Sequence, residues 1–248
     1  MFLIGDIGNT EIKVCLIDTN NKVYKKIIFS NHNISLLKLK FNLKKLEKYL
    51  SKVEKILFCS VVPKSFQLIK KYLKMKTKIR CVEIKELNLS SIIKIKVNYN
   101  QVGSDRLVNA VSLLNNINNF IIIDLGTATT FDVLVKNIYK GGIIAPGIKI
   151  SLNTLSEKAS LIPKIDLKIV KKVIGADTTT AVRSGFLWGY AGLIDNIVKL
   201  IKKETRKSFK VVITGGFSKL FKNPIKTNVT IDKDITLKGL IKILKIIK

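Results

Sequence analysis

The stretch Phe120-Ile-Ile-Ile-Asp124-Leu-Gly126-Thr-Ala-Thr-Thr130 indicates the fold class of this 248-residue chain. A run of branched apolar residues ends on an aspartate, and glycine with small hydroxyl residues then forms a turn. A second apolar segment follows at residues 131–135. Apolar runs bounded by turn residues are typical of strands. We therefore predict a strand, a tight turn and a returning strand, with an aspartate at the corner.

The same order of residues opens the chain, as Ile4-Gly-Asp6-Ile-Gly8-Asn-Thr10. Both copies read apolar strand, aspartate, one residue, glycine, small polar turn and returning strand. Self-similarity of this kind indicates a duplicated unit. We predict an α/β protein with two lobes, residues 1–115 and 116–248, and a cleft between them.

Hydrophobic periodicity outlines the remaining elements. Alternating apolar residues and Gly/Asn turns predict a β-meander at the start of the chain, and longer periods predict helices and strands in alternation. The predicted strands are residues 2–6, 11–18, 23–30, 55–62 and 210–213, and the predicted helices are residues 36–52, about 63–75, 179–204 and 237–247. The last helix is basic and amphipathic, so it could lie on a membrane, but covering the sheet is the favoured interpretation.

Composition predicts a cytoplasmic globular protein with no membrane partner. Hydrophobic residues make up 47% of the chain, yet no apolar run approaches the ~18 residues of a membrane span. The N-terminus has no basic leader and its apolar run is cut at Asp6. Cys15, Cys59 and Cys81 lie far apart in apolar stretches, which favours reduced core thiols. A single histidine argues against a His/Cys metal cluster.

The formal net charge of +28 raises the question of a nucleic-acid partner. The lysines are spread almost evenly and accompany many Ile and Asn residues, so a solvated lysine surface is the favoured interpretation. We predict no specific nucleic-acid partner. The charge would still attract ATP by long-range steering.

The two Asp-x-Gly turns are the first candidates for chemistry. A tight glycine hairpin exposes backbone N–H groups that can hold phosphate oxygens, and the adjacent aspartate can hold a cation. A single such turn is ordinary turn chemistry, whereas two copies favour a function. Neither a P-loop nor a Gly-x-Gly-x-x-Gly turn is present, so the phosphate site is of another kind.

The motifs, taken in order, resemble those of type III pantothenate kinases, which belong to the superfamily of actin, sugar kinases and the Hsp70 chaperones. They are Asp6-Ile-Gly-Asn-Thr10, Gly103-Ser-Asp-Arg106, Asp124-Leu-Gly-Thr-Ala-Thr-Thr130, Gly141-Gly-x-Ile-x-Pro-Gly147, Gly175-x-x-Thr178 and Thr214-Gly-Gly216. The resemblance implies two duplicated actin-like (ribonuclease H-like) lobes with mixed sheets flanked by helices. It also implies phosphorylation of pantothenate by ATP to 4′-phosphopantothenate, the first step of coenzyme A biosynthesis.

The resemblance assigns ATP contacts to the first hairpin and to Thr127. The hairpin residues are Asp6, Ile7, Gly8, Asn9, Thr10, Glu11, Ile12 and Lys13. In the family Asp6 would place Mg²⁺, and Asp124 would bind a monovalent cation, K⁺ or NH₄⁺. Lys13 suits a counter-charge for phosphate, although a solvent-facing lysine is nearly as plausible. The turn at Thr214 suits either the adenosine end of the nucleotide or an ordinary strand-to-helix turn.

The pantothenate site implied by the family is made of Gly103, Ser104, Asp105, Arg106 and Thr178. Asp105 is the candidate general base, which would accept the proton of the primary hydroxyl. Arg106 suits a carboxylate or a phosphate. The alternatives are that the Asp-Arg pair caps a helix beginning near Leu107, and that Thr178 caps a helix beginning near Thr179.

Two positions depart from the family pattern. The family usually has alanine where this chain has Ser104, a small change that we expect to be tolerated. The family's tyrosine usually stands further ahead of this turn than Tyr99, which is four residues before Gly103. Tyr99 is therefore left out of the predicted site.

The resemblance also implies a homodimer that pairs through the second lobe. Two other functions stay open: a non-catalytic regulator of the Bvg accessory factor type, and a kinase of another small hydroxylated acid. Retention of Asp6, Asp105 and Asp124 favours a catalyst over a regulator, because a regulator has no physical need for carboxylates beside a phosphate site. Pocket shape would set the choice among acids.

Overall fold

The predicted β-meander opens the computed structural model, in which residues 1–247 are described. Strands β1 (Phe2–Ile7), β2 (Glu11–Ile17) and β3 (Val23–Ser30) run antiparallel to their neighbours. On its other side β1 pairs in parallel with β4 (Lys55–Ser60), which pairs in parallel with β5 (Cys81–Glu83). The result is a mixed sheet in the order β3-β2-β1-β4-β5.

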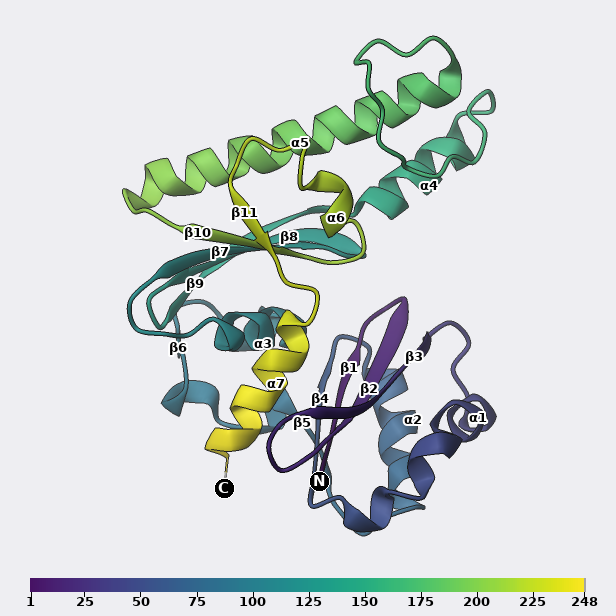
Figure 1. Cartoon of the computed structure of the whole chain (residues 1–248), viewed down its shortest axis with the longest axis vertical. Coiled ribbons are helices and arrows are strands. Elements are labelled where there is room, and N and C mark those ends of the chain that lie inside the picture. The colour runs from purple at the N-terminus through teal and green to yellow at the C-terminus, as the bar shows by residue number, and fades with distance from the viewer. Residues whose placement is uncertain (248) are drawn as a thin grey trace. The chain divides into compact units, whose positions relative to one another are not determined.

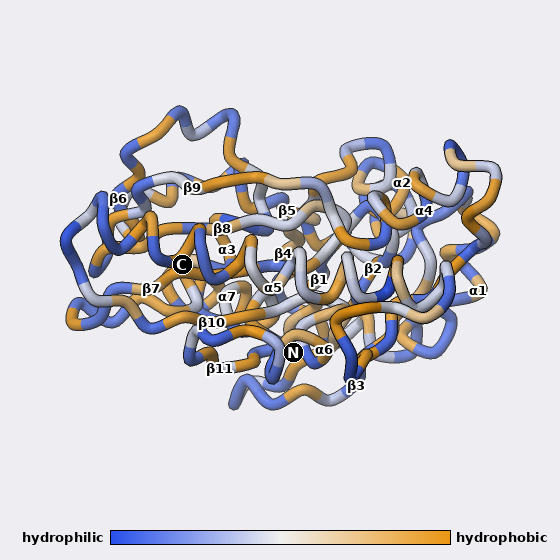
Figure 2. Tube along the Cα trace, turned by 90° about the horizontal axis from the view of Figure 1, so that it is seen from above, coloured by the Kyte–Doolittle hydropathy of each residue, from blue (hydrophilic) through white to orange (hydrophobic). Residues whose placement is uncertain are grey.

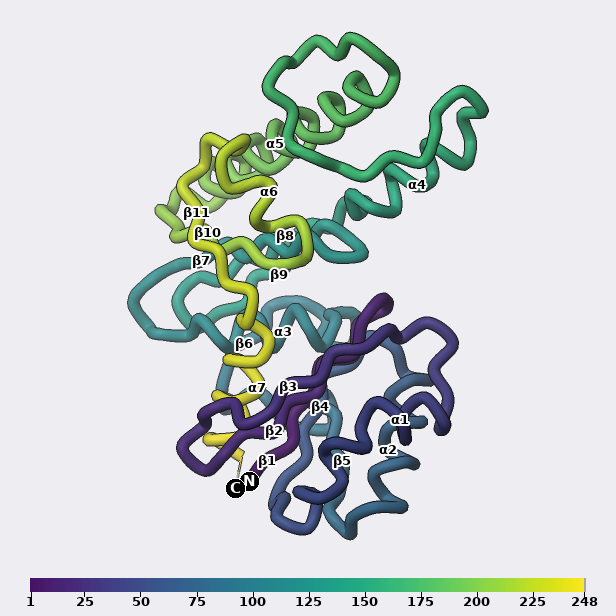
Figure 3. Tube along the Cα trace, turned by 45° about the vertical axis from the view of Figure 1, so that its right-hand side comes forward, coloured from purple at the N-terminus to yellow at the C-terminus, as the bar shows by residue number. Residues whose placement is uncertain are grey.

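The two faces of this sheet have different helices (Figures 1 and 3). Leu3, Ile7 and Phe58 belong to the core formed with α1 (Leu36–Glu47) and α2 (Pro63–Lys74). Because side chains alternate along a strand, Asp6 and Cys59 face the opposite side. That side is covered by α3 (Ser104–Ser112) and α7 (Ile235–Ile246).

Local sequence explains where these helices begin. Ser35 precedes α1, and its side chain accepts a hydrogen bond from the Lys38 backbone N–H at 3.3 Å. Pro63 is the first residue of α2, where its missing N–H has no consequence. The predicted helix at 36–52 is divided, since α1 ends at Glu47 and a 3₁₀ turn follows. The short elements of this part of the chain are η1 (Leu50–Lys52), η2 (Ile84–Glu86), η3 (Leu89–Ser91), β6 (Lys94–Ile95) and η4 (Tyr99–Gln101).

Five later strands repeat the topology of the first sheet. Strands β7 (Asn119–Leu125), β8 (Ala128–Val135) and β9 (Ile138–Pro146) form an antiparallel meander. Strand β7 also pairs in parallel with β10 (Lys210–Thr214), which pairs in parallel with β11 (Val229–Ile231). The order β9-β8-β7-β10-β11 therefore matches β3-β2-β1-β4-β5 strand for strand. This agreement supports the duplication predicted from the two Asp-x-Gly turns.

The long helix α5 (Thr178–Thr205) covers one face of these strands (Figure 1). Its buried apolar residues recur every three or four positions and pack in one core with Ile123, Leu125 and Phe131; they are Leu187, Ala191, Ile194, Val198 and Ile201. Figure 2 shows hydrophobic residues running along the strands and hydrophilic residues in many of the loops. Helices α4 (Ile148–Lys158) and α6 (Ser218–Phe221) complete this part of the chain.

The chain divides by its contacts into two units, each with its own sheet. The first unit is Met1–Leu114 with Asp234–Lys248, and the second is Asn115–Lys233. The last helix therefore belongs to the first unit, whereas the sequence placed all of residues 116–248 in the second lobe. The reason is that α7 packs on α3 and β1, with Ile235, Leu240 and Ile243 fully buried. The division into lobes at residues 115 and 116 stays a prediction. Within residues 1–247, no helix is long and apolar enough to cross a membrane.

Candidate active site

Asp6 lies near the end of β1, on the face of the sheet that α3 covers. Its cross-strand partner is Lys13 on β2, and the Lys13 Nζ is 3.8 Å from Asp6 Oδ2. The Cys59 thiol on β4 donates a hydrogen bond to Asp6 Oδ1 at 3.4 Å. Burial raises the pKa of Asp6, and the Lys13 ammonium and the Cys59 thiol oppose that rise. The Asp6 carboxylate thus has one ammonium group beside it.

The Cys59 thiol is fully buried and serves as a donor. Burial, together with the charges of Asp6 and Asp105, raises the pKa of Cys59 well above its ordinary value. A thiol in such surroundings stays protonated and unreactive. The sequence predicted a core thiol here, and its hydrogen bond to Asp6 is what the sequence could not indicate.

Asp105 lies in the first turn of α3, in the same unit as Asp6. Its Oδ1 accepts a hydrogen bond from the Arg106 backbone N–H at 2.8 Å. Burial is the largest cause that raises the pKa of Asp105; the Asp6 charge adds to the rise, and the Arg106 N–H opposes it. A β-carbon on Gly103 would lie 2.5 Å from Asp105 Oδ1, so the carboxylate needs glycine at that position.

The capping alternative for Asp105 is wrong. Helix α3 begins at Ser104, three residues before the expected start, and its N-cap is Gly103, which makes no side-chain cap. Asp105 is therefore inside the helix. Its carboxylate accepts from the Arg106 N–H, and a carboxylate has about four lone-pair sites, so further acceptor capacity is left for a substrate proton.

Glu83 is a residue of this site that the sequence analysis missed. Its Oε1 accepts hydrogen bonds from the Ser104 hydroxyl at 2.6 Å and from the Ser60 backbone N–H at 3.2 Å. Its Oε2 accepts from the Lys85 N–H at 2.7 Å. Glu83 thus ties the start of α3 to the end of β4. Ser104, which is 2% exposed, makes a bond here that alanine could not make.

Tyr99 lies in the 3₁₀ turn η4 of the same unit. Its hydroxyl is buried and has no hydrogen-bond partner, and the Lys85 Nζ lies 5.7 Å from the centre of its ring. Burial and the charge of Glu83 raise the pKa of Tyr99. Its side chain is thus near Glu83.

Asp124 occupies the corresponding corner of the second unit. It pairs across the strands with Thr130, on the face opposite to the one that packs on α5. A β-carbon on Gly215 would lie 2.5 Å from the Leu125 carbonyl oxygen and 2.6 Å from Asp124 Oδ1. Gly215 also has φ +89°, which favours glycine. A carboxylate and a carbonyl oxygen therefore lie together against a bare backbone, and such hard oxygen donors suit K⁺.

Thr127 is exposed at the tip of the second hairpin. The hairpin closes with the Gly126 N–H donating to Ala128 O at 3.1 Å, so β8 begins three residues before the expected Phe131. A β-carbon on Gly147 would lie only 1.9 Å from the Thr127 carbonyl oxygen. The Pro-Gly end of β9 therefore passes directly against this turn. This contact explains why the motif Gly141-Gly-x-Ile-x-Pro-Gly147 ends on a glycine.

Thr178 is the first residue of α5 and is exposed. The N-cap is Asp177, whose Oδ1 accepts from the Thr180 N–H at 2.8 Å. The alternative that Thr178 is the cap is therefore wrong. A β-carbon on Gly175 would lie only 2.3 Å from the Ala181 nitrogen. The segment before α5 therefore packs closely against the first turn of that helix.

The predicted site residues thus form two groups. Asp6, Lys13 and Asp105 lie in the first unit, together with the Gly103–Arg106 turn. Asp124, Thr127 and Thr178 lie in the second. A cavity of about 670 Å³ at the end of α2, lined by residues 70 and 74–81, contains none of them.

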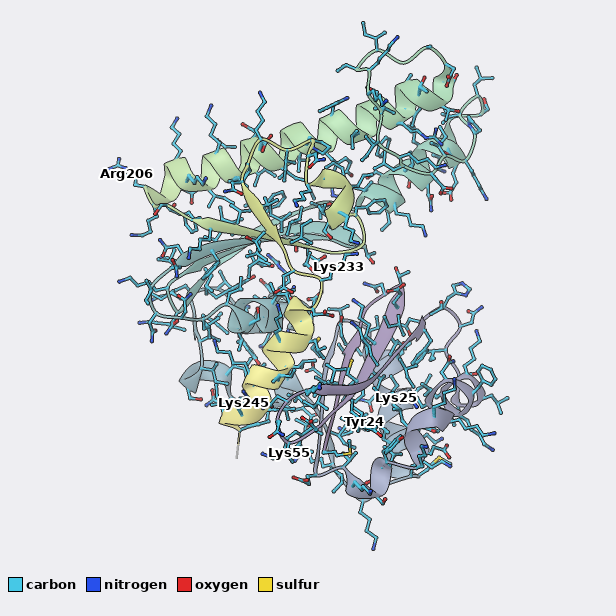
Figure 4. The ribbon with its side chains drawn as sticks, viewed as in Figure 1. Tyr24, Lys25, Lys55, Arg206, Lys233 and Lys245 are labelled. Atoms are coloured by element: carbon cyan, nitrogen blue, oxygen red, sulfur yellow. The ribbon has the colours of Figure 1, made fainter. Side chains whose placement is uncertain are left out.

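Two further observations bear on charged ligands. Among residues 1–247, no group of three or more His, Cys, Asp or Glu side chains could hold a metal ion. Mg²⁺ does not require one, because it is commonly held by one or two carboxylates and substrate phosphates. Basic side chains lie on many elements of both units, as Figure 4 shows for Lys25, Lys55, Lys245, Arg206 and Lys233.

Comparison with known proteins identifies the family. Residues 2–200 match the type III pantothenate kinases. The type III pantothenate kinase of Pelagibacter ubique (strain HTCC1062) is 59% identical over 248 residues, which is 100% of both chains. The chain belongs to the type III pantothenate kinase family.

Solved structures agree on the fold of this type III pantothenate kinase family member. A Campylobacter jejuni protein assigned to the Baf family of transcriptional activators has a TM-score of 0.58 at 20% identity, with 98% of each chain covered. The activator of 2-hydroxyisocaproyl-CoA dehydratase from Clostridium difficile, solved with ADPNP, has a TM-score of 0.53 at 11% identity, covering 97% of this chain and 77% of that one. At these identities the likeness shows the fold alone.

The predicted family and the predicted actin-like fold are therefore confirmed. The predicted enzyme class, an ATP-dependent kinase of coenzyme A biosynthesis, is confirmed by family membership. The roles of individual residues, the metal ions and the oligomer stay predictions.

Proposed function

We propose that this protein transfers the γ-phosphoryl group of ATP to the primary hydroxyl of pantothenate, giving 4′-phosphopantothenate and ADP. One observation supports this most directly: a type III pantothenate kinase is 59% identical along the whole chain. The partly buried carboxyl of Asp105, in the same unit as Asp6, would supply the base that such a reaction needs. The reaction would be the first step towards coenzyme A.

Asp105 would act as the general base. As the hydroxyl oxygen forms a bond to the γ-phosphorus, Asp105 takes the hydroxyl proton, and the bond from that phosphorus to the β,γ-bridging oxygen breaks. The electron pair leaves with ADP. A carboxylate with a raised pKa is better matched to this transfer than an ordinary aspartate.

The first hairpin would hold the ATP phosphates. Its small residues 8–10 allow close approach of backbone N–H groups, and the Lys13 ammonium would offset phosphate charge. Asp6 would hold Mg²⁺, which neutralises charge on the transferring oxygens when bound. These are the positioning and electrostatic effects on which phosphoryl transfer mainly depends.

The second hairpin would hold the monovalent cation. The carboxylate of Asp124 and the Leu125 carbonyl oxygen, both against Gly215, are donors of the type that K⁺ or NH₄⁺ prefers. Thr127, exposed at the hairpin tip, would contact ATP.

Pantothenate would contact the turn of Gly103 and Ser104, with Arg106 directed to its carboxylate or to the transferred phosphate, and Thr178 would contribute from α5.

The proposed setting is a cytoplasmic homodimer. The second unit exposes large apolar side chains, among them Leu161 at 91%, Ile174 at 87% and Val173 at 66%. Apolar residues gathered in one segment mark interaction surfaces more often than isolated ones do. Sedimentation equilibrium of the purified chain would show whether it dimerises.

The deciding experiment is an assay of purified protein with ATP, Mg²⁺, K⁺ and pantothenate, with mass spectrometry of the product and a potassium-free control. We expect 4′-phosphopantothenate that depends on K⁺. If the folded, ATP-binding protein phosphorylates a different hydroxylated acid instead, that acid replaces pantothenate as the proposed substrate. A protein that binds ATP and phosphorylates none would favour the regulatory function.

A further inference from the structure

Asn31, the residue after β3, contacts both sides of the first hairpin. Its backbone N–H donates to the Thr10 carbonyl oxygen at 2.9 Å, and its side-chain Nδ2 donates to the Gly8 carbonyl oxygen at 2.7 Å. The side chain is 6% exposed. One residue outside every motif of the family therefore engages the carbonyls on either side of Asn9.

Ser65 fixes the orientation of the Asn31 amide. Its hydroxyl, in the first turn of α2 and 3% exposed, donates to Asn31 Oδ1 at 2.7 Å. If the amide were reversed, Oδ1 would face the Gly8 carbonyl oxygen, and two acceptors would meet without a proton between them. The pair is buried, so neither group can turn to water instead. The hairpin is thus connected through Asn31 to a helix.

A hairpin binds phosphate through its backbone N–H groups, and a carbonyl oxygen turned to the same anion would repel it. In this chain the Gly8 and Thr10 carbonyl oxygens are already occupied by Asn31. The group that occupies them is neutral, whereas a carboxylate at this position would add negative charge beside the phosphates.

We propose that Asn31, oriented by Ser65, is a positioning residue for the ATP phosphates, which keeps residues 8–10 in the phosphate-binding conformation. This inference rests on the proposed function of the first hairpin. The inference adds a residue outside the hairpin, Asn31, that determines nucleotide affinity.

The test compares Asn31→Asp with a matched control. Asn31→Asp keeps the acceptor for Ser65 and replaces the Nδ2 donor in a side chain of nearly the same shape. Asn42→Asp is the control, because the Asn42 amide also donates to a backbone carbonyl, that of Lys38 at 2.8 Å, but on the exposed surface of α1. Ser65→Ala removes only the hydroxyl.

The measurements are the dissociation constant of a non-hydrolysable ATP analogue by calorimetry, KM for each substrate, and the melting temperature. For Asn31→Asp we expect weaker analogue binding by about tenfold, because a buried acceptor loses its donor. Ser65→Ala should weaken binding in the same direction but less, and Asn42→Asp should not. KM for pantothenate should stay within about twofold of the wild-type value, since the change acts on the phosphate hairpin alone.

Unchanged analogue binding by folded Asn31→Asp would overturn the inference, as would equal rises in both KM values. A variant that only folds less well would lose active protein without changing the dissociation constant of the folded fraction. If Asn31→Asp does not fold, Ser65→Ala decides the question by the same criterion. A wild-type protein that binds no analogue would refute the proposed function itself, which is a different outcome from equal binding by wild type and variant.

Discussion

The two Asp-x-Gly hairpins have the same strand order but different surroundings. Asp6 faces an ammonium, Lys13, across the strands, and a thiol donates to it from the neighbouring β4. Asp124 faces Thr130 and lies against the backbone of Gly215. The first hairpin is held from outside by a side chain, Asn31, whereas the second is held by the close passage of the Gly147 backbone.

This difference shows how one duplicated corner can serve two kinds of ligand. An aspartate beside a cationic side chain suits an anionic ligand with its metal, because the local charges balance. An aspartate among backbone oxygens suits a bare monovalent cation. The duplicated strand pattern supplies the corner, and the residues packed on it determine the ligand.

The largest effect is expected from Asp105, because its carboxylate is close enough to the first hairpin for the Asp6 charge to raise its pKa. Asp105→Asn should lower kcat by about a thousandfold, since the base is lost, while ATP-analogue binding persists. Single-turnover kinetics with calorimetry would measure both. Turnover close to wild type would remove Asp105 as the base.

The same variant should raise the melting temperature. The pKa of Asp105 is above its ordinary value in the folded chain, so the folded state prefers the protonated form. Folding therefore loses stability as pH rises from the ordinary aspartate value of 3.8 through the raised pKa, and at neutral pH the ionised carboxylate costs stability. Asparagine removes that cost. Asp166→Asn, at an exposed position, is the control and should leave the melting temperature unchanged.

The next prediction concerns Asp124 and its cation. Asp124→Ala should weaken the apparent affinity for K⁺ by about 10–100-fold, by analogy with the loss of groups around other metal sites. KM for pantothenate at saturating K⁺ should change much less. Titration of activity with KCl at constant ionic strength would measure the effect. Thr130→Val, which keeps the carboxylate, should retain wild-type K⁺ dependence, and an equal loss in both variants would contradict a role specific to Asp124.

The smallest effect is expected from Lys13, which is partly exposed and therefore screened by solvent. Lys13→Met should raise KM for ATP by about fivefold or less, in the range of exposed ion pairs, and more at low salt than at high salt. Lys22→Met, in an exposed turn of the same unit, is the control. If Lys13→Met raises KM for ATP at low salt no more than Lys22→Met does, Lys13 is the solvent-facing lysine of the alternative interpretation.

Much of the fold could be predicted from the sequence, because strands and helices here have strong local patterns. The apolar run before Asp124 and the period of residues 179–204 correspond to β7 and α5 within one or two residues. The strand β9 was not predicted, since its Gly141 and Gly142 interrupt the apolar pattern. The assignment of α7 to the first unit depends on packing between segments over 100 residues apart, which periodicity does not report.

The site was predicted less completely for a similar reason. Motifs identify residues that touch ligands, such as Asp6 and Asp105, whose roles come from the family. Asn31, Ser65 and Glu83 act through other residues, and these hydrogen-bond partners are 21 to 34 positions away in the chain. Nothing in their local sequence sets them apart from ordinary loop or surface residues.

The assignment of α7 to the first unit also has a consequence for synthesis on the ribosome. Residues 115–233 form a continuous unit and can fold as soon as they emerge, as domains generally do during translation. Most of the first unit is translated earlier, but it lacks one of its helices until α7 emerges. Helix α7 packs closely on α3, because a β-carbon on Gly239 would lie only 2.1 Å from the Val108 carbonyl oxygen. The unit that carries the candidate base is therefore completed only once α7 has emerged, after the whole second unit has been synthesised.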